Sequence, residues 1–318
     1  MRTELVTIPS GRWRLHGVLH RPADTFPRKV GVLILQESYN TKFGTHRLFL
    51  QLSNALSEAG FYSLRYDNRG ICDSDGILDI TFADRLADAR AVLPYFREHC
   101  RLDTVIVWGL CMGTAVAVHL AGESRAQGID GLMLCSILAD PADASIPQFG
   151  YYRPEISHFL RQNLRQGDWF KRLRQFSEVR KKVARWITIW KDHYFSQEHF
   201  SPQAELRRLR EAVEKVGPLL TQYEKPSLLV FGEQDAAWAS FRDKINPGDR
   251  LGLGRKIFPP QFEIIPNGGH TFASREQTAQ LLRLTLNWLE PFRYGRLPRV
   301  AKSDSGITDG IPVASAAH

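Results

Sequence analysis

Apolar residues in the first half of the chain fall into short continuous runs, and longer stretches with helical spacing separate these runs. Strands that are buried on both faces read as unbroken apolar runs, so this alternation predicts a mainly parallel sheet with helices on both faces. The predicted strands cover residues 15–22, 30–36, 61–67, 104–109 and 131–138, and the predicted helices cover residues 43–60 and 81–100. The fold class is therefore α/β.

The alternation stops at about Pro141, and the segment that follows is rich in arginine and aromatic residues at helical spacing. Buried strands are predicted again at residues 226–232 and 261–268, followed by a helix at residues 275–292. One sheet interrupted by a helical insertion explains this order more simply than two independent domains. We predict a core of residues 1–140 and 226–297, a helical cap of residues 141–225, and a disordered tail of residues 298–318.

Positive charge is concentrated in the predicted cap. Between Tyr151 and Lys225 there are sixteen basic and nine acidic residues, so this segment carries seven of the eight net positive charges of the chain. It is either a solvated helical face or a surface that attracts an anionic substrate, an acidic carrier protein, CoA, a glycan or an anionic membrane. Nucleic acid is the least favoured partner, because no nucleic-acid-binding motif accompanies the charge.

The amino terminus has no apolar stretch behind a basic segment, so the sequence predicts a cytoplasmic protein. The apolar window of residues 104–122 has the length of a membrane span, but its glycines and one histidine predict a strand, a turn and a helix, and no transmembrane segment is expected. The cysteines, Cys72, Cys100, Cys111 and Cys135, are predicted to be free thiols. None has zinc-ligand spacing and no nucleotide-binding motif occurs, so neither a metal nor another cofactor is expected.

The sequence Gly109-Leu110-Cys111-Met112-Gly113 joins a predicted strand to a predicted helix. A sharp strand-to-helix turn around a nucleophile needs both glycines, because side chains beside the nucleophile would collide. The turn places the Cys111 thiol at the carboxyl edge of the sheet, over a helix N-terminus whose dipole favours the thiolate. Cys111 is the candidate nucleophile, and the alternative is a buried structural cysteine at a glycine turn.

Two residues that could assist a nucleophile follow later strands. Asp235 lies in the loop after the predicted strand at residues 226–232, and His270 lies in the loop after the strand that begins at residue 261. Both loops leave the carboxyl ends of strands. The order along the chain is nucleophile, acid and then histidine, which is the order of the triad in α/β-hydrolases.

With GLCMG at residues 109–113, Asp235 and His270, the chain resembles the α/β-hydrolase superfamily over about residues 12–292. The turn D-N-R-G-I-C-D-S at residues 67–74 is similar to the D-x-R-G-x-G-x-S turn of that superfamily, with Cys72 in place of the usual glycine. The resemblance implies an α/β-hydrolase fold with an inserted helical cap. It also makes Asp140 a competing candidate for the acid, because this fold sometimes carries the acid one strand earlier.

Two groups within the superfamily are similar to different parts of the chain. Gln36-Glu37 after the strand at residues 30–36, together with GLCMG and GHTF, resembles the dienelactone hydrolases, which implies that Glu37 contacts the thiol. The alternative is that Glu37 is a carboxylate at a strand end that faces solvent. The arginine-rich and aromatic-rich segment that starts at Tyr151 resembles the insertion of the exosortase A system-associated hydrolases, and this likeness covers the layout of the whole chain.

The resemblance implies nucleophilic catalysis. Cys111 attacks a carbonyl carbon, His270 moves the proton, and Asp235 fixes the tautomer of the histidine. The backbone N–H groups of Met112 and Ser38 stabilise the oxyanion. The expected reaction is hydrolysis of an ester or thioester through an acyl-enzyme.

Three aromatic residues flank the expected pocket in the sequence and are predicted to line it: Tyr39, Tyr151 and Trp238. The expected partner is a small-molecule acyl substrate, either free or carried on CoA or an acyl carrier protein. Transfer of the acyl group to an amine or alcohol is an alternative to hydrolysis, because the acyl-enzyme of a cysteine is itself a reactive thioester. A non-catalytic ligand-binding protein with the same fold is the further alternative.

Overall fold

The computed structural model describes residues 2–23, 26–37, 40–76, 81–123, 128–144 and 202–298. Most of the predicted cap, residues 145–201, and nearly all of the predicted tail, residues 299–318, lie outside these ranges. Three predicted site residues lie outside them as well: Ser38, Tyr39 and Tyr151.

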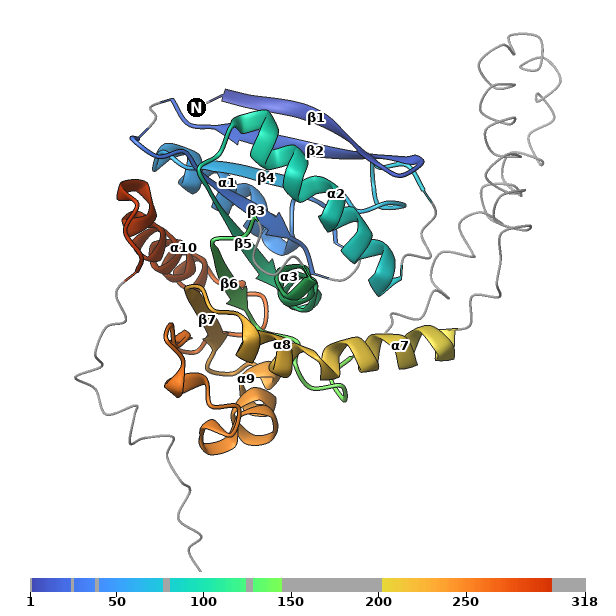
Figure 1. Cartoon of the computed structure of the whole chain (residues 1–318), viewed down its shortest axis with the longest axis vertical. Coiled ribbons are helices and arrows are strands. Elements are labelled where there is room, and N and C mark those ends of the chain that lie inside the picture. The colour runs from blue at the N-terminus through green and yellow to red at the C-terminus, as the bar shows by residue number, and fades with distance from the viewer. Residues whose placement is uncertain are drawn as a thin grey trace, which may run out of the picture. The chain divides into compact units, whose positions relative to one another are not determined.

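Within the described ranges, eight strands form one sheet in the order β1-β2-β4-β3-β5-β6-β7-β8 (Figure 1). The strands are β1 (Arg2–Ser10), β2 (Trp13–Arg21), β3 (Val30–Leu35), β4 (Tyr62–Tyr66), β5 (Thr104–Leu110), β6 (Gly131–Cys135), β7 (Ser227–Gly232) and β8 (Gln261–Ile265). β2 pairs antiparallel with β1 and with β4, and all other neighbouring strands are parallel. The predicted mainly parallel sheet is confirmed.

Helices cover both faces of this sheet. The helices of the described ranges are α1 (Leu48–Glu58), α2 (Phe82–Cys100), α3 (Met112–Glu123), α7 (Pro202–Glu214), α8 (Val216–Gln222), α9 (Ala236–Ser240) and α10 (Arg275–Leu289). Short helical turns occur at Thr45–Arg47, Phe241–Ile245, Pro247–Asp249, Leu253–Arg255 and Glu290–Tyr294. α2 and α3 pack together on one face, and α1 and α10 pack together on the other (Figure 1).

The central strands are buried along their whole length, as unbroken apolar runs require. Alternate residues of these strands point to opposite faces, so each face supplies apolar side chains to the helices above it. On the face of α1 and α10, the Trp108 ring of β5 meets the Phe49 ring of α1 edge-on with centroids 5.8 Å apart. The window at residues 104–122 forms β5 and α3, and none of the helices in the described ranges is long and apolar enough to cross a membrane.

Local hydrogen bonds fix where the long helices begin. The Thr81 side chain accepts a hydrogen bond from the Asp84 backbone N–H, and the Asp84 carboxylate accepts one from the Thr81 N–H, so α2 starts directly after Thr81. Ser274 and Gln277 form the same reciprocal pair at the start of α10. Both helices begin within one residue of the predicted positions.

Two parts of the first half differ from the prediction. β1 was not predicted as a strand, although it pairs with β2 along its full length. The predicted helix at residues 43–60 is shorter, because His46 and Arg47 adopt left-handed backbone conformations with φ of 55° and 60°. A helix cannot run through such residues, so α1 starts at Leu48.

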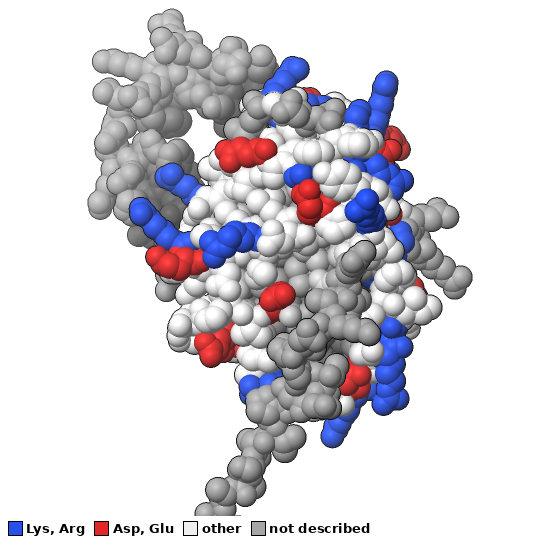
Figure 2. Space-filling view, turned by 90° about the vertical axis from the view of Figure 1, so that its left-hand side faces the viewer, with Lys and Arg blue, Asp and Glu red and all other residues white. Residues whose placement is uncertain are grey.

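Contacts between residues divide the chain into two units, residues 1–144 with 208–318 and residues 145–207. Helix α8 belongs to the first unit and packs on α3. On the face shown in Figure 2, basic and acidic side chains are interspersed, which agrees with the near-zero net charge outside the arginine-rich segment. The cap at residues 141–225 remains a prediction.

Candidate active site

Cys111 stands at the apex of the turn between β5 and α3, half-buried, with a left-handed φ of 52°. A side chain in place of Gly109 would put its Cβ 2.7 Å from the Gly113 backbone, and one in place of Gly113 would put its Cβ 2.3 Å from the Leu35 carbonyl oxygen. Both approaches are shorter than any contact that a Cβ makes. The two glycines are therefore required by the close passage of the turn against itself and against β3.

The loops after β7 and β8 bring an acid and a histidine together. His270 Nδ1 lies 2.9 Å from Asp235 Oδ1. Asp235 also caps α9, because the same oxygen accepts a hydrogen bond from the Ala237 N–H at 3.0 Å. The Asp235 side chain is 1% exposed and that of His270 is 43% exposed, so the acid is shielded while the imidazole can reach a substrate.

The three residues Cys111, Asp235 and His270, called the triad group below, are coupled electrostatically. Hydrogen bonds to Asp235 and to Cys111 raise the pKa of His270 to about 10. Burial alone would raise the pKa of Asp235, but His270 and the Ser136 hydroxyl hold it below its ordinary value. The bond to the buried Asp235 carboxylate therefore favours the protonated form of His270.

The other cysteines have surroundings that disfavour a thiolate. Burial raises the pKa of Cys100 to about 11 and raises that of Cys135 well above its ordinary value. Cys72 is exposed, but partial burial and the nearby Asp67 carboxylate raise its pKa as well. Arg21 near Cys100 and Lys42 near Cys72 act in the opposite direction, but burial outweighs each of these cations.

The competing acid, Asp140, has another partner. Its carboxylate forms an ion pair with Lys244 at 2.7 Å and accepts a hydrogen bond from the Ala142 N–H at 2.8 Å. The structure thus brings Asp235, and not Asp140, to the histidine. His119 packs edge-on against Phe82 and bonds to the Ala212 carbonyl at 2.8 Å, which is a structural position within α3.

Glu37 is buried just after β3, and its carboxylate holds the following loop. Its Oε1 accepts hydrogen bonds from the side chain of Asn40, from the Thr45 N–H at 3.2 Å and from the Thr45 hydroxyl. These bonds explain the sharp return of the chain before α1. A contact of the other carboxylate oxygen, Oε2, with the Cys111 thiol remains a prediction.

The predicted oxyanion and pocket residues are only partly described. Met112 is the first residue of α3, so its N–H is one of those that intrahelical bonding leaves without a carbonyl partner. Trp238 lies on α9, and its ring packs against Phe231 of β7 with centroids 5.1 Å apart. That contact gives the ring a structural role beside the loop of Asp235.

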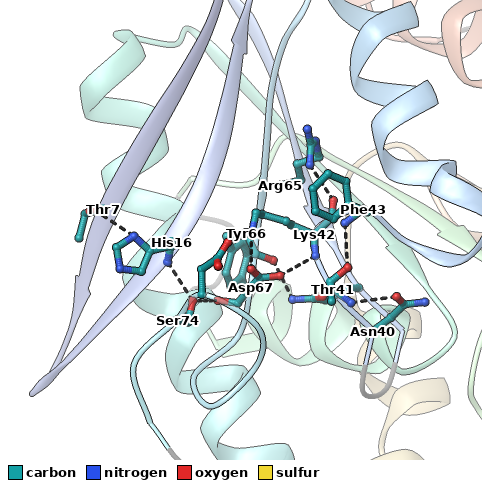
Figure 3. Close-up of polar contacts among 12 residues, drawn as sticks. Thr7, His16, Asn40, Thr41, Lys42, Phe43, Arg65, Tyr66, Asp67 and Ser74 are labelled. Atoms are coloured by element: carbon teal, nitrogen blue, oxygen red, sulfur yellow. Dashed lines mark hydrogen bonds and ion pairs between the residues drawn. The ribbon is translucent and has the colours of Figure 1, made fainter. Parts of the chain in front are cut away.

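Sequence reasoning missed a network between the loop after β3 and the turn after β4 (Figure 3). The Lys42 ammonium contacts Asp67 at 2.5 Å and Asp73 at 2.6 Å, and the Lys42 N–H donates to Asp67. Arg65 donates to the Lys42 carbonyl, and Ser74 donates to the Asp67 carbonyl. These five residues, Lys42, Arg65, Asp67, Asp73 and Ser74, form the loop-turn network.

One group of metal-type side chains occurs in the described part of the chain, and it belongs to this network. Asp67, Cys72 and Asp73 hold their ligand atoms within 4.8 Å of one another. The Lys42 ammonium already bonds to both carboxylates, so a lysine supplies the positive charge at this position. The group fits an internal ion pair better than a metal.

Comparison with known proteins identifies the family. A family profile described as alpha/beta hydrolase fold matches residues 40–273, which is most of the chain. The protein belongs to the α/β-hydrolase family. This assignment confirms the predicted fold and shows that the protein is an enzyme of the hydrolase type.

A curated relative and two solved structures illustrate the range of this α/β-hydrolase's neighbours. The lysophosphatidylserine lipase ABHD12 of Danio rerio is 27% identical over 135 residues, which cover 40% of this chain and only 34% of that protein. Est1E from Butyrivibrio proteoclasticus, solved with ferulic acid, has a TM-score of 0.58 at 16% identity and covers 92% of this chain and 98% of its own. Dienelactone hydrolase from Anabaena variabilis has a TM-score of 0.56 at 13% identity, covering 91% and 97%.

Proposed function

We propose that this hydrolase cleaves an ester or thioester through Cys111, His270 and Asp235, with a thioester acyl-enzyme as intermediate. The observation that supports the proposal is the 2.9 Å contact of His270 with buried Asp235, together with the interaction of His270 with a cysteine at the apex of the β5–α3 turn. A charged imidazole beside a half-exposed thiol is the arrangement that makes cysteine nucleophilic.

The proposed chemistry follows from the bonding of the imidazole. Its Nδ1 is bonded to Asp235, so Nε2 serves the sulfur. The Cys111 thiolate attacks the carbonyl carbon, and the Met112 N–H, with that of Ser38, stabilises the oxyanion. His270 then gives its proton to the leaving alkoxide or thiolate as the old bond breaks. In the second half, His270 takes a proton from water, the hydroxide attacks the thioester, and the product leaves as a carboxylic acid.

Acyl transfer is the second candidate function, and the cysteine favours it. A thioester intermediate is attacked readily by an amine or an alcohol, and either acceptor would replace water in the second half of the reaction. The proton balance is the same, because His270 accepts a proton from the acceptor instead of from water.

The substrate class rests on charge and on the relatives. One relative is a lipase and another was solved with ferulic acid, so acyl groups of very different size occur among similar proteins. The seven excess positive charges at residues 151–225 favour an anionic carrier such as CoA or an acyl carrier protein. Tyr39, Tyr151 and Trp238 are proposed to line the acyl site.

The test is to trap the acyl-enzyme. The protein is mixed with p-nitrophenyl esters and with acyl-CoA thioesters, and intact mass spectrometry should detect one acyl group per chain. Fragmentation should locate the group on Cys111. Adding an amine or alcohol acceptor then separates hydrolysis from transfer, because only transfer yields the amide or ester product.

Two variants control this experiment. Cys111→Ala should show no acyl adduct. Cys72→Gly removes the exposed thiol at a position where the φ of 47° suits glycine, so it should label like the wild type. An adduct on another residue, or full turnover by Cys111→Ala, would refute the proposed nucleophile.

A further inference from the structure

The end of β6 lies between the strands that lead to Cys111 and to Asp235. Cys135, the last residue of β6, is in register with Leu110 of β5 on one side and with Val230 of β7 on the other. Its carbonyl accepts the Cys111 N–H at 3.1 Å. The strand end therefore anchors the nucleophile turn directly.

The next residue, Ser136, reaches the histidine. Its hydroxyl donates to the His270 carbonyl at 2.9 Å, and its N–H donates to the Val230 carbonyl at 2.8 Å. Ser136 is fully buried and has a left-handed φ of 50°. The backbone turns out of the strand at this point, and the hydroxyl bonds to the main chain of the loop after β8.

Ser136 also adjoins the acid. Asp235 uses Oδ1 for both of its hydrogen bonds, to His270 and to Ala237, while Oδ2 is buried without a partner in the described region. The Ser136 hydroxyl is close enough to this carboxyl to lower its pKa. A hydroxyl has a single hydrogen, so it donates either to the His270 carbonyl, as observed, or to the Asp235 carboxylate, and it links the two in both cases.

We propose that Ser136 is a positioning residue that holds the His270 loop against Asp235, so that the imidazole keeps its bond to the acid while Nε2 faces Cys111. The inference deepens the proposed function and rests on it for its kinetic consequence. It also predicts a change in the pKa of His270, which can be measured without any substrate. Ser136 touches no reacting atom, so its effect must pass through the geometry of the histidine.

The test compares Ser136→Ala with Ser136→Gly. Both remove the hydroxyl, whereas only glycine relieves the left-handed backbone, so glycine folds where alanine is strained. Both variants should lower kcat by about ten- to hundredfold with little change in KM, because misplacing a catalytic group by a fraction of an ångström has effects of this size. The pKa of His270, measured by NMR titration, should fall by about one unit, because the bond to Asp235 weakens.

Ser53→Ala is the matched control. Ser53 is equally buried, and its hydroxyl has no hydrogen-bond partner in the described part of the chain, so its removal should change neither kcat nor the His270 pKa. Full activity and an unchanged His270 pKa in Ser136→Gly would overturn the proposal. So would recovery in Ser136→Gly of a loss seen in Ser136→Ala, since this would assign the effect to backbone strain.

The NMR measurement separates this inference from the proposed function. If Cys111→Ala proves fully active, the proposed nucleophile is wrong, but a lower His270 pKa in both Ser136 variants still supports the positioning role. If acyl-Cys111 forms and the His270 pKa is unaffected by Ser136, the function stands and the positioning role fails.

Discussion

The triad group and the loop-turn network both lie at the carboxyl ends of strands, but their hydrogen bonds end differently. In the loop-turn network, the Lys42 ammonium is enclosed by two carboxylates, one of them fully buried. In the triad group, buried Asp235 bonds to His270, and the imidazole interacts with the half-exposed sulfur of Cys111. The charge of Lys42 is enclosed by its partners, whereas the sulfur of Cys111 is partly accessible.

This difference separates stability from chemistry. A charge enclosed by partners cannot react without breaking the bonds that hold the loop, so its loss should destabilise the fold. Hydrogen-bonded groups that end at an accessible side chain can act on a substrate. Removing one of these groups should therefore reduce turnover and leave the fold intact. Substitutions in the two groups should therefore give opposite patterns of effects.

The largest effect is expected in the triad group. His270→Ala and Asp235→Asn should each lower kcat by roughly 10²- to 10⁴-fold, because the first removes the proton carrier and the second leaves the imidazole with the wrong tautomer. Steady-state kinetics with a p-nitrophenyl ester measures the loss. Asp140→Asn is the control, because Asp140 pairs with Lys244 and should change kcat little. A large loss from Asp140→Asn with none from Asp235→Asn would reverse the two roles.

The next effect belongs to the loop-turn network. Lys42→Met should reduce the free energy of unfolding by about 3–5 kcal/mol, because it leaves the buried Asp67 carboxylate without its cation. Asp73→Asn removes the exposed partner of the same lysine, at 65% side-chain exposure, and should cost less than about 1 kcal/mol. Urea unfolding measures both variants. Equal losses of unfolding free energy in the two variants would show that the buried pair with Asp67 contributes no more than the exposed pair with Asp73.

Local sequence was enough to predict the parts of the site that depend on neighbouring residues. The glycines around Cys111 and the strand ends before Asp235 and His270 are short-range signals, and the structure places Asp235 against His270. The glycine preference at position 72 is also local, since Cys72 has a left-handed φ of 47°. Strand β1 is buried only at alternate residues, so its sequence contains no long continuous apolar run.

The remaining features depend on pairs that are distant in the chain. Lys42 meets Asp67 across 25 residues, and Ser136 meets His270 across 134 residues. A lysine in a loop or a serine after a strand carries no local signal of such a partner. Register between parallel strands decides which loops meet, and that register is a property of the assembled sheet.

A smaller effect is expected for His20, which extends the loop-turn network. Its Nε2 lies 3.3 Å from Arg65 Nη2. Burial, with the Arg65 charge, lowers the pKa of His20 from 6.5 to about 4. Above pH 6.5 the imidazole is neutral in the folded and unfolded states. Between pH 6.5 and 4 the unfolded state binds the proton first, so the protein loses up to about 3 kcal/mol of stability as pH falls.

His20→Gln should flatten this pH dependence. Urea unfolding at several pH values between 4 and 7 measures the slope for the wild type and the variant. His46→Gln, which removes an exposed histidine, should retain the wild-type slope. The same slope in His20→Gln as in the wild type would mean that other groups cause the loss of stability and that protonation of His20 does not weaken the loop-turn network.

The smallest effect decides to which of the two groups Glu37 belongs. Its Oε1 accepts the bonds from Asn40 and Thr45, and a glutamine keeps an oxygen for those bonds. Glu37→Gln therefore removes only the charge and the acceptor at Oε2. If Oε2 faces the thiol, as the resemblance to the dienelactone hydrolases predicts, kcat should fall about tenfold. Cys111 alkylation should move to lower pH in the same variant, because a neighbouring anion disfavours the thiolate.

Those opposite signs cannot arise from a disturbed loop, which would harm turnover and thiol reactivity together. Thr45→Val supplies the comparison, because it breaks a loop bond to Glu37 and keeps the carboxylate charge. This variant should lose stability and retain the wild-type pH profile of iodoacetamide labelling. Wild-type kinetics and labelling in Glu37→Gln would mean that Glu37 only holds its loop, like the residues of the loop-turn network. The triad group would then keep its three residues.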